Sequence, residues 1–359
     1  MSELSPHTSS MGAWIRDITL VRHDNAVTTA ITLFLAMVIS VIIHECGHLL
    51  PSLCLGFRVC RLVIGPLAIV RSQSKWRLEY SRKWFMASVS AVPAGEFAWR
   101  ARMLFVVAAG PLASFYFFLY AMHQLVDFGP FTPSSEMWSS LAQLNFFIFV
   151  LGLVPNSASA GTRNDARLFL TLCKNGDEAQ QIRLYHATTR LQAAGIRPRE
   201  YPLALLNKLA NTKGNPDLTL FNAHTLFLWA LDRQDLAVAD RWDKYTAELM
   251  DERSLRLSDT VLIESGCFDL LHRESPLNAV HKLSSANLKK VAPWLRPRAK
   301  AALFLANGSH AQAICAIAAA RKCLSPEVPY HQFELALLDA LESRAILLSS
   351  TIAGARIAA

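Results

Sequence analysis

Three long stretches without charged side chains constrain how this chain can fold more than any other feature. Residues 26–57 contain no Lys, Arg or Asp and a single Glu, and residues 103–126 and 137–162 contain none of these four residue types. A helix of about 20 apolar residues crosses a bilayer core about 30 Å thick. We therefore expect three transmembrane helices, at about residues 26–50, 103–126 and 137–158.

The rest of the chain is different in character. Beyond residue 165 charged residues recur every few positions, and no apolar stretch is long enough to cross a membrane. We expect an N-terminal segment (1–25), a membrane domain (26–165) and a soluble domain (166–359). With 52% hydrophobic and only 18% charged residues, the composition argues against a disordered chain and against an ordinary cytosolic enzyme.

The basic residues predict the orientation of the spans. The loop 57–102 carries nine Lys and Arg residues against two acidic ones, whereas the loop 127–136 has two acidic residues and no basic one. The positive-inside bias places the first loop in the cytoplasm. The soluble domain is then cytoplasmic too, in a multi-pass protein of the plasma (inner) membrane. Part of the net charge of +8 belongs to this loop, so we expect no nucleic-acid partner.

The motif His44-Glu45-Cys46-Gly47-His48 lies in the last third of the first span. Residues four apart share one helix face, so the two imidazoles can bind one zinc ion, and Glu45 can act as general base on a water. A carboxylate in lipid is energetically costly, and ionisable residues there usually mark a site. We predict His44 and His48 as metal ligands and Glu45 as the catalytic residue.

A third ligand is expected because a catalytic zinc normally has three protein ligands and one open position. Asp165 is the first carboxylate after the third span, and the predicted topology brings it to the same membrane side as His44 and His48. We predict Asp165 as the third ligand of one Zn²⁺ per chain. The alternative is that Asp165 serves as the N-cap of a helix that begins at Ala166.

Together these residues resemble the site-2 proteases, a family of intramembrane zinc metalloproteases. The resemblance covers about residues 26–170, and it departs from the family at Gly152, where members have Asn, and at Ala166, where members have Gly. It rests on HECGH, on Phe57–Leu67 with its Gly65-Pro66, on Ala109-Gly110-Pro111-Leu112-Ala113-Ser114, and on a third span that ends in Pro155 and is followed by Asp165.

The resemblance implies that His44, His48 and Asp165 bind zinc and that Glu45 is the base. It also implies a membrane-protein substrate, cleaved in or near its transmembrane segment. A helical peptide bond is shielded by its own hydrogen bonds, so the substrate has to unwind locally before it can be hydrolysed.

Three further features of the membrane half each have two interpretations. Segments 57–64 and 75–80 partly alternate at period two, which predicts a short β-hairpin that either binds substrate as an added strand or only covers the membrane surface. Gly110-Pro111 either lets a neighbouring helix approach closely or admits substrate. Asn145 either hydrogen-bonds a substrate or ties two helices together.

The sequence pattern of the soluble half predicts a series of helices. Apolar positions recur at intervals of three and four, and turn signals begin at residues 232, 273 and 307, which are 41 and 34 residues apart. This spacing is typical of helical-hairpin repeats such as tetratricopeptide arrays. We expect a mainly α protein: a three-helix transmembrane core with a short β-hairpin, followed by a cytoplasmic repeat-like domain that can bind a protein partner.

The sequence thus predicts a zinc-dependent intramembrane endopeptidase, whose partners are the bilayer and a membrane-protein substrate. One alternative is a catalytically silent membrane scaffold that recruits partners through its helical domain. A metal transporter is a second alternative. It is disfavoured because three spans offer few lining groups, and no further Asp, Glu or His lies at mid-membrane depth.

Overall fold

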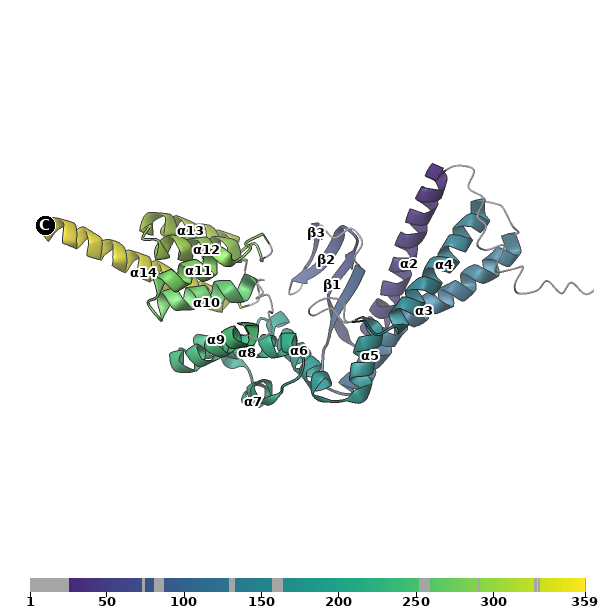
Figure 1. The fold of residues 1–359 in the computed structure, drawn as a ribbon, viewed down its shortest axis with the longest axis horizontal. Coiled ribbons are helices and arrows are strands. Elements are labelled where there is room, and N and C mark those ends of the chain that lie inside the picture. The colour runs from purple at the N-terminus through teal and green to yellow at the C-terminus, as the bar shows by residue number, and fades with distance from the viewer. Residues whose placement is uncertain are drawn as a thin grey trace, which may run out of the picture. The chain divides into compact units, whose positions relative to one another are not determined.

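The computed structural model describes residues 26–72, 75–80, 87–128, 133–156, 164–251, 259–289, 291–325, 328 and 330–358. It is mainly helical, with one small sheet (Figure 1). Its elements are α2 (Ala26–Cys54), β1 (Phe57–Ile64), β2 (Leu67–Ser72), β3 (Lys75–Tyr80), β4 (Ala87–Pro93), α3 (Trp99–Phe128), α4 (Pro133–Leu153), α5 (Asp165–Lys174), α6 (Asp177–Ala193), η1 (Pro198–Glu200), α7 (Leu203–Asn211), α8 (Pro216–Asp232), α9 (Leu236–Asp251), α10 (Asp259–Leu271), α11 (Pro276–Ser285), α12 (Leu295–Ala306), α13 (His310–Cys323) and α14 (His331–Ala358). The chain forms two compact units, with the main boundary between Lys174 and Asn175.

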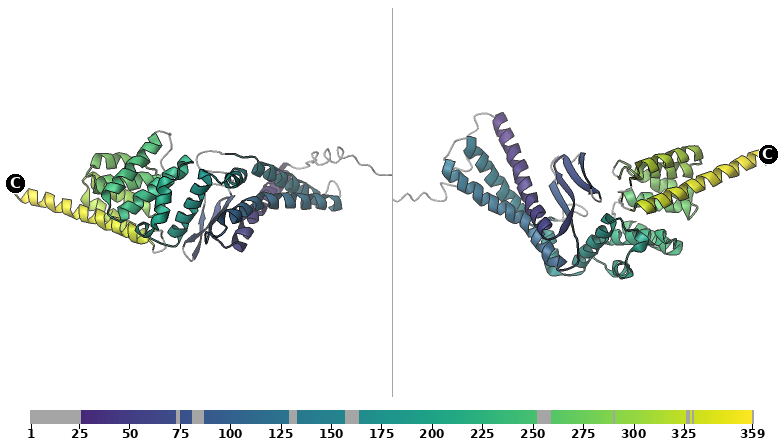
Figure 2. Two further views of the ribbon diagram at one scale, coloured as in Figure 1. Left: turned by 90° about the horizontal axis from the view of Figure 1, so that it is seen from below. Right: turned by 180° about the vertical axis from the view of Figure 1, so that it is seen from behind.

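Three helices, α2, α3 and α4, pack side by side in the first unit (Figures 1 and 2). Each is long and apolar enough to cross a membrane. Where they meet, small residues such as Ala36, Ala121 and Ala142 are buried, which lets the backbones approach closely. Large apolar side chains, Phe34 and Phe147 among them, are exposed on the outer faces. A surface of this kind is suited to contact with lipid rather than with water.

The helices differ from the predicted spans at their ends. The last helix of the bundle ends at Leu153, five residues before the predicted 158. Pro155 explains the early end, because the residue before a proline is disfavoured in the helical conformation. The first helix, α2, continues past the predicted residue 50 to Cys54 and includes Pro51.

The sheet corrects the predicted β-hairpin. The segments 57–64 and 75–80 are both strands, but they do not pair with each other, because β2 lies between them in the order β3-β2-β1-β4. All the β1 pairings are antiparallel, with Ile64 opposite Leu67 across the two-residue turn Gly65-Pro66. Gly65 has a φ of 56°, a conformation that glycine adopts without strain. Neither β2 nor β4 was predicted as a strand.

Helix α5 closes one end of the first unit. Its side chain Leu172 is fully buried, and it packs in a cluster with Phe57, Met103, Val106 and Val107. These partners come from the start of β1 and from the first turns of α3. The apolar face of α5 therefore fixes this short helix against α3, and with it the residue at its first position, Asp165.

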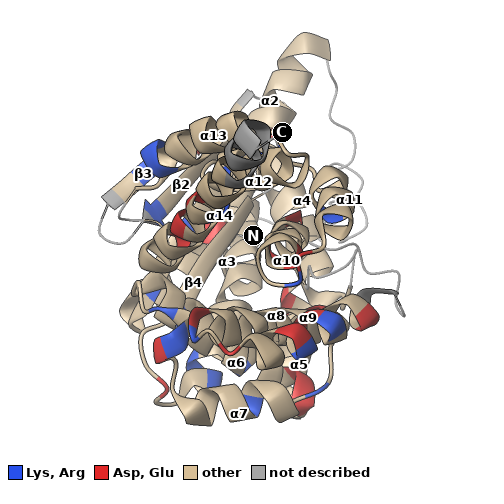
Figure 3. Ribbon diagram, turned by 90° about the vertical axis from the view of Figure 1, so that its left-hand side faces the viewer, with Lys and Arg blue, Asp and Glu red and all other residues tan. Residues whose placement is uncertain are grey.

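The second unit is all-helical. The pairs α8–α9, α10–α11 and α12–α13 each form a helical hairpin, and α14 packs on α13. The hairpin turns fall at residues 233–235, 272–275 and 307–309, next to the predicted turn signals. Basic and acidic residues are interspersed on these helices (Figure 3). The largest apolar core of the unit runs from α10 through α14, with Ile263, Ile317 and Leu341 fully buried in it.

Candidate metal centre

His44, His48 and Asp165 come together at one point of the first unit. His44 and His48 lie one turn apart on α2, and Asp165 is the first residue of α5. Among the described residues they are the one group of three His, Cys, Asp or Glu side chains whose ligand atoms all lie within 4.8 Å of one another. The sequence predicted these three residues as ligands.

The distances within this group fit one tetrahedral metal ion. Asp165 Oδ2 lies 3.1 Å from His44 Nε2 and 3.3 Å from His48 Nε2, and the two Nε2 atoms are 3.3 Å apart. Two ligands bound to one tetrahedral zinc at about 2.0–2.1 Å are themselves about 3.3–3.4 Å apart. The three donor atoms therefore form a triangle the size of one face of such a tetrahedron, which leaves the fourth vertex for a water or a substrate.

Both imidazoles are oriented by α3. The Nδ1 atom of His48 donates to the carbonyl oxygen of Val106 at 2.8 Å, and the Nδ1 atom of His44 lies 3.1 Å from the hydroxyl of Ser114. Because a carbonyl only accepts, Nδ1 of His48 carries a proton, and the ring turns its other nitrogen, Nε2, toward the cluster. Partners of this kind hold metal-binding histidines in position in many proteins.

The structure also distinguishes the two roles considered for Asp165, metal ligand and helix N-cap. The N-cap of α5 is Asn164, whose Oδ1 accepts a hydrogen bond from the backbone N–H of Arg167 at 3.2 Å. Asp165 is the next residue, and its carboxylate is directed at the two histidines. Burial alone would raise the pKa of Asp165, but its hydrogen bonds with His44 and His48 outweigh burial and hold the pKa well below the usual range.

Glu45 lies beside the cluster and is 8% exposed. Its carboxylate accepts a hydrogen bond from the backbone N–H of Val89 in β4, and it interacts electrostatically with all three members of the cluster. Within the described residues, β4 is an edge strand of the sheet. A carboxylate held at a sheet edge and next to a cluster of two imidazoles and a carboxylate is suited to take a proton from a water there.

Two glycines provide the space that the cluster occupies. A Cβ atom at Gly110 would lie 2.2 Å from Nε2 of His48, and one at Gly47 would lie 2.6 Å from the carbonyl oxygen of Ala109. Beside the cluster, α2 and α3 therefore approach too closely for a side chain at either of these two positions. Of the two interpretations of Gly110-Pro111, the structure supports close helix approach.

Asn145 ties two helices together. It is fully buried in α4, and its amide donates to the hydroxyl of Ser40 in α2 at 2.8 Å. Ser40 lies one turn before His44 on the same helix. This bond fixes α4 to the helix that carries both histidines, so helix association is the role that the contacts support for Asn145.

The amino-acid sequence does not mark Asn164 as an ordering residue of the site, and it offers Ser114 only as part of the motif at residues 109–114. Asn164 directly precedes Asp165 in the stretch that follows Pro155, where turn residues such as Asn are common. Nothing in the local sequence therefore indicates that its side chain orders the site. Ser114 is one of several serines in the apolar half, and only its contact with His44 sets it apart.

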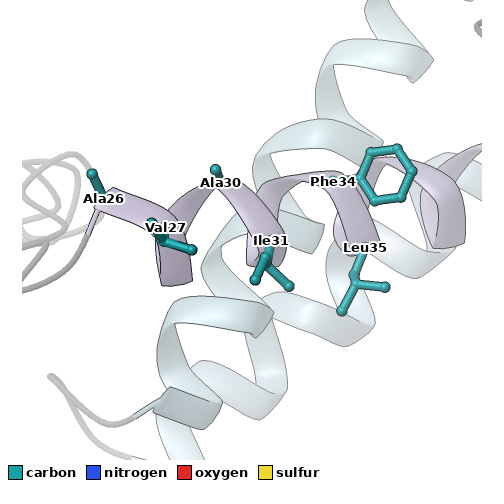
Figure 4. A pocket seen from close by; sticks show the side chains of 6 residues that line it. All are labelled: Ala26, Val27, Ala30, Ile31, Phe34 and Leu35. Carbon is teal, nitrogen blue, oxygen red and sulfur yellow. The ribbon is translucent and has the colours of Figure 1, made fainter.

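An apolar depression lies on the other half of α2. Its lining residues all belong to the first turns of that helix, as Figure 4 shows for Ala26, Val27, Ala30, Ile31, Phe34 and Leu35. None of these side chains can bind a metal or transfer a proton. The depression is therefore separate from the chemistry of the cluster, which begins nine residues later at His44.

Comparison with known protein families, with curated proteins and with solved structures finds no match to this chain.

Proposed function

We propose that the protein is a zinc-dependent intramembrane endopeptidase. The observation that carries the proposal is the triangle of His44 Nε2, His48 Nε2 and Asp165 Oδ2, with Glu45 beside it, at the end of a bundle of membrane-length helices. Two imidazoles and one carboxylate are a donor set that zinc accepts in hydrolytic enzymes. The site resembles that of the site-2 proteases in its residues.

The chemistry divides between the metal and the protein. Bound zinc would polarise the scissile carbonyl and lower the pKa of the attacking water. Glu45 takes a proton from that water on its carboxylate and delivers it to the amine nitrogen that leaves. Ser114 and the Val106 carbonyl hold the imidazoles still, so that the geometry is set before substrate binds.

The substrate in this proposal is a membrane protein whose transmembrane helix unwinds near the site. The edge of β4 that pairs with no described strand offers backbone hydrogen bonds to such an extended segment, next to Glu45. Strand addition at an edge is a common mode of peptide binding. The bundle spans the plasma (inner) membrane, with the metal centre toward the cytoplasmic side.

The second unit is proposed to be a cytoplasmic, repeat-like domain that binds a protein partner or the cytoplasmic part of the substrate. Three successive helical hairpins and the terminal α14 support this proposal. Stacked hairpins of this kind produce extended surfaces that bind other proteins.

The test uses the full chain, purified in detergent, and a panel of single-span substrates. Wild type should bind one zinc per chain and cleave. Glu45→Gln should retain the zinc and lose about 10²–10⁴-fold in cleavage rate, as expected for a missing general base. Glu136→Gln, an acidic residue in the first turn of α4, is the matched control and should cleave normally.

Two results would contradict the proposal. If Glu45→Gln kept both zinc and full cleavage, the assigned base would be wrong. If Glu45→Gln supported the full biological function and only deletion of residues 200–359 abolished that function, the protein would be a scaffold. Substrate that co-purifies with Glu45→Gln would identify the natural target.

A further inference from the structure

Asn164 makes an unusual number of hydrogen bonds for a residue at the start of a short helix. Its Oδ1 accepts from the backbone N–H groups of Asn156 (3.0 Å) and Arg167 (3.2 Å). Its Nδ2 donates to the carbonyl oxygens of Val154 (2.5 Å) and Leu151 (3.3 Å). One side chain thus contacts both the last turn of α4 and the first turn of α5.

These contacts satisfy backbone groups that two helix ends would otherwise leave unpaired. The last carbonyls of a helix and its first N–H groups have no partner within the helix. Because α4 ends at Leu153, the carbonyls of Leu151 and Val154 need donors, and the Asn164 amide supplies both hydrogen bonds. The backbone of Asn164 also donates to the Asn156 carbonyl, at 3.5 Å.

The next residue in the chain is Asp165, whose Oδ2 is a corner of the metal-binding triangle. Asn156 and Asn164 are eight positions apart in the sequence, and the Asn164 side chain joins them. A segment of this length does not by itself fix where Asp165 lies. The hydrogen bonds of Asn164 to the end of α4 fix the position of Asp165. The packing of Leu172 against α3 fixes it as well.

We propose that Asn164 is a positioning residue, which holds the Asp165 carboxylate at the metal centre by joining the end of α4 to the start of α5. The inference rests on the proposed function, because it assumes that Asp165 binds zinc. Asn164 itself contacts no member of the triangle through an observed hydrogen bond. Asn164 acts by holding Asp165 in place, so its replacement should weaken zinc binding directly. An assay of cleavage would report the effect only indirectly.

The central variant is Asn164→Ser. Serine is a good N-cap, so it keeps the hydrogen bond to Arg167, but it is too short to reach the α4 carbonyls as well. Asn164→Ala removes both sets of bonds. The matched control is Asn156→Ala, which removes the same amide group from the other end of the segment and keeps the backbone N–H that Asn164 accepts from.

The experiment measures zinc affinity by chelator competition, and the visible absorption of the cobalt(II)-loaded protein, for full chains in detergent. Asn164→Ser should bind zinc about tenfold or more weakly, the usual effect of removing support from a metal ligand. Asn164→Ala should be weaker still, and Asn156→Ala should equal wild type. The visible absorption per bound cobalt(II) should change in Asn164→Ser, because the coordination of the metal changes. General destabilisation would instead lower the amount of cobalt bound and leave the absorption per bound metal unchanged.

The outcomes separate this inference from the proposed function. If wild type and Asn164→Ser bind zinc equally and give the same cobalt spectrum, the role assigned to Asn164 is wrong and the proposed function stands. If wild type binds no zinc, or if Asp165→Ala binds as tightly as wild type, the proposed metal site is wrong and this inference fails with it.

Discussion

His48 and Gly110 lie in direct contact where α2 meets α3: a Cβ at position 110 would be 2.2–2.3 Å from the Nε2 and Cε1 atoms of the imidazole. The same helix receives the Nδ1 hydrogen bond of His48, through the carbonyl of Val106 one turn earlier. Helix α3 therefore fixes the His48 ring from two sides, by a hydrogen bond at one ring nitrogen and by the absence of a side chain at the other.

The contact between His48 and Gly110 predicts that Gly110→Ala will damage metal binding. The added methyl group cannot share the space with the ring, so His48 or the α3 backbone has to move. A displaced ligand should reduce zinc affinity by about 10–100-fold. Chelator competition on the full chain in detergent measures the change.

The control for this variant is Gly95→Ala, because a Cβ at Gly95 has no atom within 4 Å to meet. It should bind zinc as wild type does. Equal affinities for wild type and Gly110→Ala would mean that the helices adjust without moving the ring, and that Gly110 does not set the position of His48.

Ser114 is predicted to orient His44. Its hydroxyl lies 3.1 Å from Nδ1 of that ring and is fully buried. Ser114→Ala removes the hydrogen-bond partner, so the ring can rotate, and zinc affinity should fall by about 10–100-fold. Ser140→Ala, at another buried serine of the bundle, is the control and should bind normally. An affinity for Ser114→Ala that matches the control would show that α2 alone fixes the His44 ring.

The part of the site that lies on one helix could be predicted from the sequence, because a spacing of four on a helix is a local pattern. His44, Glu45 and His48 follow from it directly. Asp165 required a topological argument as well, since 121 residues separate it from His44. Ser114 and Val106 orient the rings from 70 and 58 residues away, and no local pattern links them to the motif.

The sheet shows a different limit of sequence reasoning. The segment Leu67–Ser72 is short and mostly apolar, and it follows a Gly-Pro turn, so its pairing partner was not evident. In β4, small residues such as Ser88 and Ser90 alternate with Val89 and Ala91, which gives a weak strand signal. Both strands are stabilised by pairing with β1 rather than by their own composition.

In the second unit, Arg298 of α12 is predicted to be a critical charge. It is fully buried and donates to Glu264 of α10 and to Glu334 of α14. Arg298→Met would leave two buried carboxyl groups without their cation, which typically costs about 3–5 kcal/mol of stability. Amide hydrogen exchange of these three helices in the full chain measures the loss as local opening free energies.

A triple variant tests whether the loss in Arg298→Met comes from the unpaired acids. If Glu264 and Glu334 are also replaced by apolar residues of similar size, most of the lost stability should return, because no buried charge remains. Lys300→Met, at an exposed position of the same helix, should have little effect. A triple variant as unstable as Arg298→Met would point to lost packing as the cause instead.

The last prediction concerns His186 of α6, where burial lowers the imidazole pKa to about 4. Its Nδ1 atom is buried without a hydrogen-bond partner among the described residues. In the unfolded chain the pKa is about 6.5, so between pH 6.5 and 4 the unfolded state binds a proton that the folded state does not. The contribution of His186 to stability is therefore complete above pH 6.5 and is lost as the pH falls to about 4, a change of about 3 kcal/mol. His186→Phe should remove this part of the pH dependence of hydrogen exchange in α6, whereas the control Tyr185→Phe should keep it. Identical pH profiles for wild type and His186→Phe would contradict the prediction. They would show that the His186 ring takes up its proton as readily in the folded protein as in the unfolded one.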